Sequence, residues 1–339
     1  MAHFTLRQLK YFTTVVEHRS IAEASRHLHI AQPSISTAIK NLEESFEQLL
    51  FIRHHAQGVS LTPGGRRFYE KAAELLRMSK QFEQNARADN DMVSGTLSVG
   101  CFETAAPLYM PKLLAGFKKL YPKIEVEIHD GEQDELTEGL QHGRFDMAIL
   151  YRHELDSSIH TEPLKAPQKP YALLPADHPL AFRSSVSLEE LSREPMILLD
   201  VLPSRNYFLD IFKKKGLSAN VAFSSPSIEM VRCMVGQGFG FSLLVTRPFP
   251  DFTYDGKRVT RVTIRDEMEG SCLVMAHLRN AEPTRPTQLF MDYCRTQELT
   301  PEHISEAETA AIISLVPPSS AENGISAAKM PHTRQAGLG

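Results

Sequence analysis

Three short stretches within the first 45 residues carry apolar side chains at the spacing of amphipathic helices. Thr5 and Ser20 each precede a glutamine or glutamate by three positions, which predicts capping boxes, and Pro33 suits the first position of a third helix. Two short helices joined by a turn at 29–31 and packed on another helix predict a helix-turn-helix. The predicted buried positions are Leu9, Phe12, Val15, Val16, Ile21, Ala24, Leu28, Ile35, Ile39 and Leu42.

The front of the third helix carries small polar side chains instead of bulky apolar ones. A recognition helix enters the DNA major groove by its N-terminal end, where Gln32 can pair with an adenine edge and Lys40 can neutralise a phosphate. The spacing of the apolar residues alone is equally consistent with a small helical core whose polar residues face solvent and do not contact DNA. The candidate DNA contacts on this helix are Gln32, Pro33, Ser34, Ser36, Thr37 and Lys40.

A short hairpin with a basic tip is predicted next, because apolar runs flank the segment 53–58. This is the pattern of the wing of a winged helix, in which Arg53 and His55 would reach backbone phosphate or the minor groove. A metal site at His54 and His55 is the weaker interpretation. We expect no metal and no cofactor.

A long helix is predicted from about 63 to 90, since Thr62 and Pro63 suit its start. Its apolar and small residues recur at alternating spacings of four and three, a heptad seam that a two-stranded coiled coil would bury. The alternative is one helix packed on its own domain. We favour dimerisation, because a dimer presents two recognition helices to two half-sites. The seam residues are Phe68, Ala72, Leu75, Ser79, Phe82 and Ala86.

The residues from Leu6 to Arg66 resemble the DNA-binding domain of LysR-type transcriptional regulators. The matching pieces are "LRQLKYF", "SIAEASRHLHIAQPSIS", "IKNLEE", "LFIR" and "LTPGG", and the resemblance extends over about the first 300 residues. It implies a winged helix-turn-helix that binds double-stranded promoter DNA. The resemblance also implies that five residues face DNA, namely Gln32, Pro33, Ser34, Ser36 and Thr37.

Two positions depart from that family pattern. Glu47 stands where the family commonly has glycine, which would end the third helix in a left-handed conformation. Thr37 stands where the family often has arginine, so strong guanine recognition is not expected from it.

Strands and helices alternate after residue 94, which predicts a parallel α/β sheet. The segments 135–150 and 229–244 align without a gap, so two similar lobes are expected. The resemblance implies that they form a two-lobed, periplasmic-binding-protein-like effector domain, and the fold class is α/β with an N-terminal all-α winged helix-turn-helix. The expected domains are 4–62 (winged helix), 63–92 (linker and dimerisation helix), 94–298 (lobe 1 at 94–163 and 268–298, lobe 2 at 164–267) and 299–339 (disordered tail).

A ligand is expected outside the carboxyl ends of the strands, where open α/β sheets bind their ligands. Helix N-termini at Thr104, Arg205 and Ser227 would point N–H groups into the cleft and favour an anion. For any single position, a loop residue facing water is an equally good interpretation. The candidate effector contacts are Cys101, Phe102, Glu103, Thr104, Gln133, Tyr151, Ser204, Arg205, Ser225, Ser227 and Thr246.

The pair of Glu103 and Arg205 suggests a particular effector. Arg205 could clamp a carboxylate and Glu103 could hold an ammonium or amide, which favours a zwitterionic or carboxylate-bearing small molecule. The alternative is that each residue pairs with another charge of the protein.

Charge and composition narrow the class of protein. The net charge is −4, but the first 90 residues carry 12 Lys+Arg and 9 Asp+Glu, so a modest basic excess lies in the predicted DNA-binding part. The four cysteines form no CxxC pair, and no apolar run is long enough to span a bilayer. We therefore expect a cytoplasmic homodimer or homotetramer that also contacts RNA polymerase.

An enzyme is not expected, because no nucleophile elbow, zinc-protease, phosphate-loop or dinucleotide-binding motif stands in a supporting context. The alternative function is a cytosolic solute-binding or enzymatic α/β protein with a helical dimerisation arm.

Overall fold

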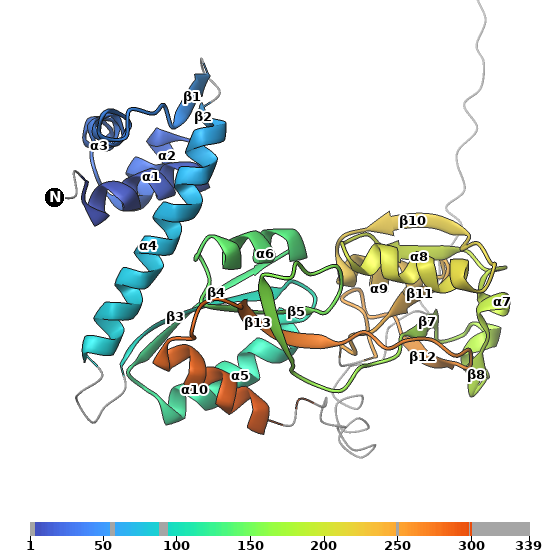
Figure 1. Ribbon diagram of the computed structural model, residues 1–339. Coiled ribbons are helices and arrows are strands. Elements are labelled where there is room, and N and C mark those ends of the chain that lie inside the picture. Colours follow the sequence, from blue (N-terminus) through green and yellow to red (C-terminus); the bar gives the residue numbers. More distant parts are fainter. Residues whose placement is uncertain (1–3, 55–57, 88–93, 249–250, 298, 300–339) are drawn as a thin grey trace, which may run out of the picture. The chain divides into compact units, whose positions relative to one another are not determined.

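The computed structural model describes residues 4–54, 58–87, 94–248, 251–297 and 299 (Figure 1). Residue 299 marks the end of the first of two compact units, Met1–Leu299. The expected tail begins at 299, but Leu299 is buried in the core of the lobes, and 300–339 lies outside the described residues. No helix in these ranges combines the length and the apolar character that crossing a bilayer requires.

The first domain is a winged helix with a core of its own. Seven of the ten predicted positions are buried there, while Val16, Ile21 and Leu28 are partly buried against that core. The elements are α1 (Leu6–His18), α2 (Ile21–Leu28), α3 (Gln32–Ser45), β1 (Phe51–His54), β2 (Gly58–Leu61) and α4 (Pro63–Arg87).

The helix starts follow the predicted capping with two corrections. Thr5 and Gln8 form the predicted capping box of α1. At the start of α2, Ser20 accepts a hydrogen bond from the Glu23 N–H, but the Glu23 carboxylate pairs with Arg26, so only half of the predicted capping box forms. In α3, however, Ala31 is the N-cap, so Pro33 occupies the second helical position and not the first. Gln32 therefore lies in the helix at its N-terminal end.

Glu47 adopts the left-handed conformation that a glycine would favour, with φ 48°. The Gln48 N–H donates to the Glu43 carbonyl (3.0 Å), and the Glu47 N–H donates to the Glu44 carbonyl (3.3 Å). This pair of bonds is a Schellman motif with glutamate in place of glycine. The sharp end of α3 that leads to the wing is therefore kept despite the departure from the family pattern.

The wing is the antiparallel pair β1–β2, as predicted. Its position relative to α1 is set by a hydrogen bond from the Val59 N–H to the Arg19 carbonyl (3.0 Å). Gly58, at φ 87°, makes this approach possible, because a Cβ there would lie 2.3 Å from the Arg19 oxygen.

Within the described residues, the second half of the chain builds three sheets in two lobes. One five-stranded sheet lies in the part that we call lobe 1, and one four-stranded and one two-stranded sheet lie in the part that we call lobe 2. In lobe 1, α6 lies on one side of the sheet and α5 and α10 on the other (Figure 1). Lobe 1 comprises β3 (Gly95–Phe102), α5 (Ala106–Leu120), β4 (Ile124–Gly131), α6 (Gln133–Gln141), β5 (Met147–Tyr151), β6 (Ile159–Pro163), β13 (Leu273–Leu278) and α10 (Arg285–Thr296). Lobe 2 comprises β7 (Tyr171–Pro175), η1 (Pro179–Phe182), β8 (Ser185–Val186), α7 (Leu188–Leu191), β9 (Met196–Leu199), α8 (Ser204–Lys214), β10 (Val221–Ser225), α9 (Ile228–Gly236), β11 (Ser242–Leu244) and β12 (Val259–Ile264).

The prediction of parallel sheets is wrong in part. Lobe 1 has the strand order β4-β3-β5-β13-β6, in which β3 is parallel to β4 and β5 but β13 is antiparallel to both of its neighbours. In lobe 2, β7 is antiparallel to β11 and β12. β13 returns from lobe 2 through a connection without a helix, so it enters the sheet in the opposite direction.

The internal repeat corresponds to one helix–turn–strand unit in each lobe. The segment 135–150 contains most of α6 and β5, and the segment 229–244 contains most of α9 and β11. The chain passes from lobe 1 to lobe 2 through 164–170 and returns through 265–272, and these are the two crossovers expected from the sequence.

Candidate functional site

The exposed front of α3 carries the predicted DNA contacts. Gln32, Ser34 and Thr37 are not part of the buried inner face: Gln32 and Ser34 are exposed, while Ile35 and Ile39 are buried. The N-cap is alanine, so no side chain caps the first N–H groups, and no acidic residue stands in the first turn. This end of the helix can therefore receive a phosphate or a base edge.

Lys40 and Arg53 extend this surface. Lys40 is exposed and lies 3.4 Å from Glu44, an exposed pair that contributes little and that a phosphate can displace. Arg53 is exposed on β1. The His54 ring nitrogen Nε2 lies 2.7 Å from the Ser60 hydroxyl across the wing. His55 lies outside the described residues.

The predicted seam of α4 divides into two parts. Phe68 packs against Phe12 and Phe46, with ring centroids 5.2 and 4.8 Å apart, and Ala72 is buried. These two residues serve the core of their own domain. Leu75 and Phe82, in contrast, are 37% and 74% exposed.

The exposed part of the seam continues into a groove. Ser79 lies between Leu75 and Phe82, and the side chain of Ala86 lies outside those that the structure describes. Met78, 53% exposed, joins Leu75 and Phe82 on α4, and we call these three residues the α4 patch. A groove of about 360 Å³ adjoins Leu75 and is lined by Phe4, Leu9, Phe46, Gln48, Gly64, Arg67, Phe68, Lys71, Ala72 and Leu75.

A cavity of about 620 Å³ lies between lobe 1 and lobe 2. Lobe 1 contributes the carboxyl ends of β3 and β5, and lobe 2 contributes α8 and the carboxyl ends of β9 and β11, as the strand-end rule predicts. It is lined by Thr104, Tyr151, Arg152, His153, Pro167, Leu188, Leu199, Pro203, Ser204, Tyr207, Phe208, Asp210, Ile211, Lys214, Lys215, Leu244, Val245, Thr246, Glu267, Met268, Glu269, Gly270, Ser271 and Cys272.

Four of the predicted effector contacts line this cavity: Thr104, Tyr151, Ser204 and Thr246. Ser204 begins α8, whose N-cap, Pro203, makes no side-chain capping bond, so α8 has N–H groups at the cavity that a ligand can satisfy. Thr104 precedes α5, in which Pro107 has no N–H. The Ala105 and Leu108 N–H groups there donate to backbone carbonyls. Burial raises the pKa of Tyr151, which keeps its hydroxyl neutral.

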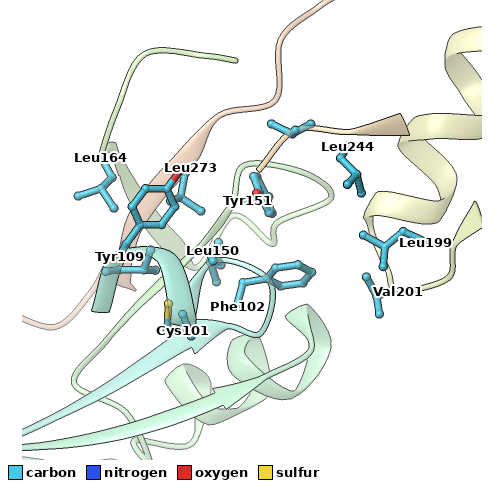
Figure 2. Packing of buried hydrophobic residues seen from close by; sticks show 14 of the residues in the cluster. Cys101, Phe102, Tyr109, Leu150, Tyr151, Leu164, Leu199, Val201, Leu244 and Leu273 are labelled. Carbon is cyan, nitrogen blue, oxygen red and sulfur yellow. The ribbon is translucent and has the colours of Figure 1, made fainter. Parts of the chain in front are cut away.

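The other predicted contacts do not line the cavity. Cys101 and Phe102 are fully buried among apolar side chains (Figure 2). Gln133 is buried and donates to the His153 carbonyl. Ser227 caps α9, and Ser225 accepts from the Ser227 N–H, so both act within their own turn.

Glu103 and Arg205 also do not line the cavity. The cavity therefore does not support a ligand whose carboxylate binds Arg205 and whose ammonium or amide binds Glu103. Arg205 is 53% exposed and pairs with Asp200 at 3.3 Å, which is the alternative that the sequence left open. The Glu103 N–H donates to the Gly131 carbonyl (3.1 Å). Burial, followed by the charges of Glu132 and Asp130, raises the pKa of Glu103.

Three contacts join α8 and the residue after it to the crossover 265–272 along one side of the cavity. The Tyr207 hydroxyl donates to the Glu269 carbonyl (2.6 Å), Lys214 lies 3.7 Å from the Glu269 carboxylate, and Lys215 lies 3.8 Å from Asp266. The two lysines are thus paired. Arg152, in contrast, has no ion-pair partner within the described ranges and can pair with a ligand.

Most of the residues that α8 contributes to the cavity were not predicted from the sequence. Ser204, Tyr207, Phe208 and Ile211 follow one another at helical spacing, so the periodicity of this segment was a signal for a single lining face. The crossover residues 267–272 carried no such signal, since they lie in a connection without regular structure.

Two family models match the chain. One, described as "Bacterial regulatory helix-turn-helix protein, lysR family", covers residues 6–66, and the other, "LysR substrate binding domain", covers residues 90–298. Together they span the winged helix and both lobes.

Similar proteins agree with these matches. HinK, a LysR family transcriptional regulator of Pseudomonas aeruginosa, is 59% identical, with a TM-score of 0.60 over 87% of this chain and 98% of that one. YvbU, an uncharacterized HTH-type transcriptional regulator of Bacillus subtilis (strain 168), is 34% identical over 241 residues, or 71% of this chain and 81% of that protein. A full-length OxyR variant of Pseudomonas aeruginosa, 24% identical over 88% of this chain and 100% of that one with a TM-score of 0.67, shows a likeness of fold alone.

Proposed function

Since the chain belongs to the LysR family of DNA-binding transcriptional regulators, we propose that a small carboxylate bound between its lobes controls how its winged helix binds promoter DNA. The observation that carries this proposal is the cavity of about 620 Å³, to which the strand ends of both lobes contribute. A ligand that touches both lobes binds best in one arrangement of them, so it can shift the chain between states.

The α3 front supports the DNA-binding half of the proposal. Gln32 and Ser34 are exposed at the N-terminal end of α3, while Ile35 and Leu42 are buried, and Lys40 follows on the exposed surface. Base recognition would come from Gln32, whose amide can form two hydrogen bonds with adenine. Lys40 and Arg53 would bind the phosphate backbone and add affinity that does not depend on sequence.

The chemistry of the cavity supports a carboxylate with an apolar body. The start of α8, at Ser204, offers N–H groups, and Arg152 offers its guanidinium. The remaining wall is largely apolar, with Leu199, Phe208 and other aliphatic and aromatic side chains. Asp210 and Glu267 also line the cavity, so a cationic amine is the competing ligand class.

The α4 patch supports self-association through α4. Leu75, Met78 and Phe82 expose apolar surface along one helix, beside the apolar groove. A second copy of α4 would cover this patch and place two α3 helices on one operator.

The test of the ligand class is a thermal-shift screen of the full chain against monocarboxylates, dicarboxylates, amino acids and amines. A ligand at a hundredfold excess over its dissociation constant stabilises the folded form by about 2.7 kcal/mol. We expect stabilisation by apolar monocarboxylates that also changes the gel shift of the DNA upstream of the gene.

Two matched arginine variants locate the site. Arg152→Gln should abolish the stabilisation, whereas Arg205→Gln should leave it, because Arg205 pairs with Asp200 outside the cavity lining. Stabilisation by amines alone would contradict the carboxylate assignment. Stabilisation that survives in Arg152→Gln would contradict the placement of the carboxylate.

A further inference from the structure

Three side chains of types that can bind a metal ion meet on the lobe 1 sheet, and none of them lines the cavity between the lobes. His160 and Glu162 belong to β6, and His277 belongs to β13. One ligand atom from each lies within 4.8 Å of the others. No sequence pattern pointed to this cluster, because His277 lies far along the chain from the other two, which form only a His-x-Glu pair.

The strand register accounts for the cluster. His160 and His277 are direct cross-strand partners in the antiparallel pair β6–β13, with ring centroids 5.0 Å apart. Residues two apart on a strand point to the same face, so Glu162 projects on the same side as His160. The backbone therefore brings two imidazoles and one carboxylate together without help from a loop.

Hydrogen bonds orient two of the three ligands. The His277 Nδ1 lies 2.9 Å from the Leu278 carbonyl, so the proton belongs on Nδ1 and the Nε2 lone pair remains for a ligand. Arg295 donates to the Glu162 Oε2 at 2.6 and 3.0 Å, while the other oxygen, Oε1, lies 3.6 Å from the His160 Nε2. Such outer hydrogen bonds are the usual supports of metal ligands.

Ion pairing alone does not account for this arrangement. Arg295 already neutralises Glu162, so the carboxylate does not need two further imidazoles beside it. Donors bound to one tetrahedral zinc ion lie about 3.4 Å apart, given bonds of roughly 2.0–2.1 Å. The His160–Glu162 separation of 3.6 Å is close to this value, and small rotations of half-buried side chains would bring in His277.

We propose that His160, Glu162 and His277 bind a divalent transition-metal cation of the zinc class, with water completing the coordination. Two imidazole nitrogens and one carboxylate oxygen suit Zn²⁺, Co²⁺, Ni²⁺ or Cu²⁺, whereas Mg²⁺ and Ca²⁺ prefer oxygen ligands only. The half-exposed ligands and the nearby Arg295 cation make this an exchangeable site and not a permanently filled one.

The position of the site gives the metal a structural consequence. β6 continues into the crossover 164–170, and β13 begins after the crossover 265–272. A bound cation would cross-link the two strands that lead to and from lobe 2. Metal binding should therefore stabilise the β6–β13 pair of lobe 1, and it acts at the strand ends away from the two connections, where His160 pairs with His277.

The test uses the full chain, free of any affinity tag and stripped of metal with a chelator. Calorimetric titration with Zn²⁺ should show a saturable site at one equivalent per chain, and Co²⁺ should give visible absorption bands of nitrogen and oxygen coordination. His160→Ala and His277→Ala should each weaken this site by about tenfold or more. Mg²⁺ should not bind there.

A matched control separates this cluster from the other histidines. His178 also faces a glutamate, Glu194, at 3.7 Å, but no second imidazole among the described residues joins them in a metal-binding cluster. His178→Asn, in which asparagine can still cap η1, should retain the site. Circular dichroism of each metal-free variant checks its folding, and His160→Gln or His277→Gln replaces the alanine variant of the same residue if that one fails this check. Absence of saturable Zn²⁺ binding, or equal binding by wild type and the His160 and His277 variants, would overturn the proposal.

Discussion

Glu103 has a carboxyl oxygen, Oε1, that is buried and accepts no hydrogen bond from the part of the chain that the structure describes. Burial and two neighbouring carboxylates raise the pKa of this group. Since the folded pKa lies above the unfolded one, the unfolded state loses its proton first as the pH rises. Ionisation of Glu103 therefore reduces stability, and the reduction is complete only above the folded pKa.

Glu103→Gln should accordingly increase the free energy of unfolding at pH 7.5, and the gain should shrink as the pH falls toward 4. Denaturant unfolding of both proteins across this range measures the difference. Glu127→Gln, at an exposed position of β4, is the control and should show no such trend. A gain that is the same at both ends of the range would contradict the role given to the Glu103 charge.

Gln32 and Lys40 should affect DNA binding in different ways. Gln32→Ala removes a base contact, so it should weaken operator binding by roughly 1–3 kcal/mol and relax sequence preference. Lys40→Ala removes a phosphate contact, so it should weaken all DNA similarly and reduce the salt dependence. Gel shifts with operator and scrambled DNA at several salt concentrations measure the DNA affinity of the two variants. Unchanged operator binding by Gln32→Ala would contradict the placement of α3.

Single residues of the cavity could be predicted from the sequence only where the backbone fixes the direction in which the side chain points. Thr104 and Tyr151 were found because parallel strands end at one edge of a sheet. At the start of α8, the same rule named both Ser204 and Arg205, but successive helical residues point about 100° apart. Only Ser204 of this pair lines the cavity, and the rotation of a helix depends on packing that the local sequence does not reveal.

At the scale of elements, the end of α3 offers a test of backbone strain. Glu47, at φ 48°, holds the left-handed position of a Schellman motif. A residue with a Cβ is disfavoured there by about 1–2 kcal/mol, partly offset by the greater freedom of glycine in the unfolded chain. Glu47→Gly should therefore stabilise the domain by roughly 0.5–1 kcal/mol.

Denaturant unfolding of the fragment 1–90, which contains the separate winged-helix core, measures this effect. Glu44→Gly, within the helix, should instead destabilise the same fragment by about 1 kcal/mol. If both substitutions destabilise it, the left-handed conformation at Glu47 is wrong.

The α4 patch offers a test of self-association. Phe82→Glu would place a charge in the apolar contact between two α4 helices and should cost about 3 kcal/mol, or more than a hundredfold in the dimer dissociation constant. Sedimentation of the fragment 1–90 measures dimer dissociation for Phe82→Glu and for the control Arg66→Glu. The control introduces a glutamate at an exposed position outside the patch. A wild-type fragment that remains monomeric would refute the proposed contact.

The elements themselves were largely predictable, because caps, turns and periodicity are local. The capping box at Thr5, the wing and the start of α4 all follow from a few neighbouring residues. The seam of α4 shows the limit of this reasoning. Periodicity identified an apolar face, but not that Phe68 and Ala72 pack inside their own domain while Phe82 is exposed.

On the scale of the whole molecule, the two lobes followed from the internal repeat, whereas the direction of the returning strands did not. β13 is antiparallel to β5 because the chain comes back from lobe 2 without a crossover helix, and no local pattern encodes that return. Buried residues of the two lobes form one cluster, separate from the winged-helix core. A ligand in the cavity therefore acts on a different core from the one that holds α3.

Coupling between these two parts must be reciprocal. If the bound carboxylate changes the affinity for operator DNA by some factor, operator DNA changes the affinity for the carboxylate by the same factor, because the four states form a closed cycle. Typical couplings are roughly 1–3 kcal/mol, or about 5–150-fold. We expect a factor within this range for the full chain.

Two measurements at one salt concentration test this equality: the operator dissociation constant with and without saturating carboxylate, and the carboxylate dissociation constant with and without saturating operator. Arg152→Gln should remove both shifts together, because it removes the ligand contact, and Arg205→Gln should preserve both. Unequal factors would mean that the ligand and DNA do not bind the same assembly. The carboxylate would then act by changing the oligomeric state, and the α4 patch, not the α3 front, would be the surface to examine next.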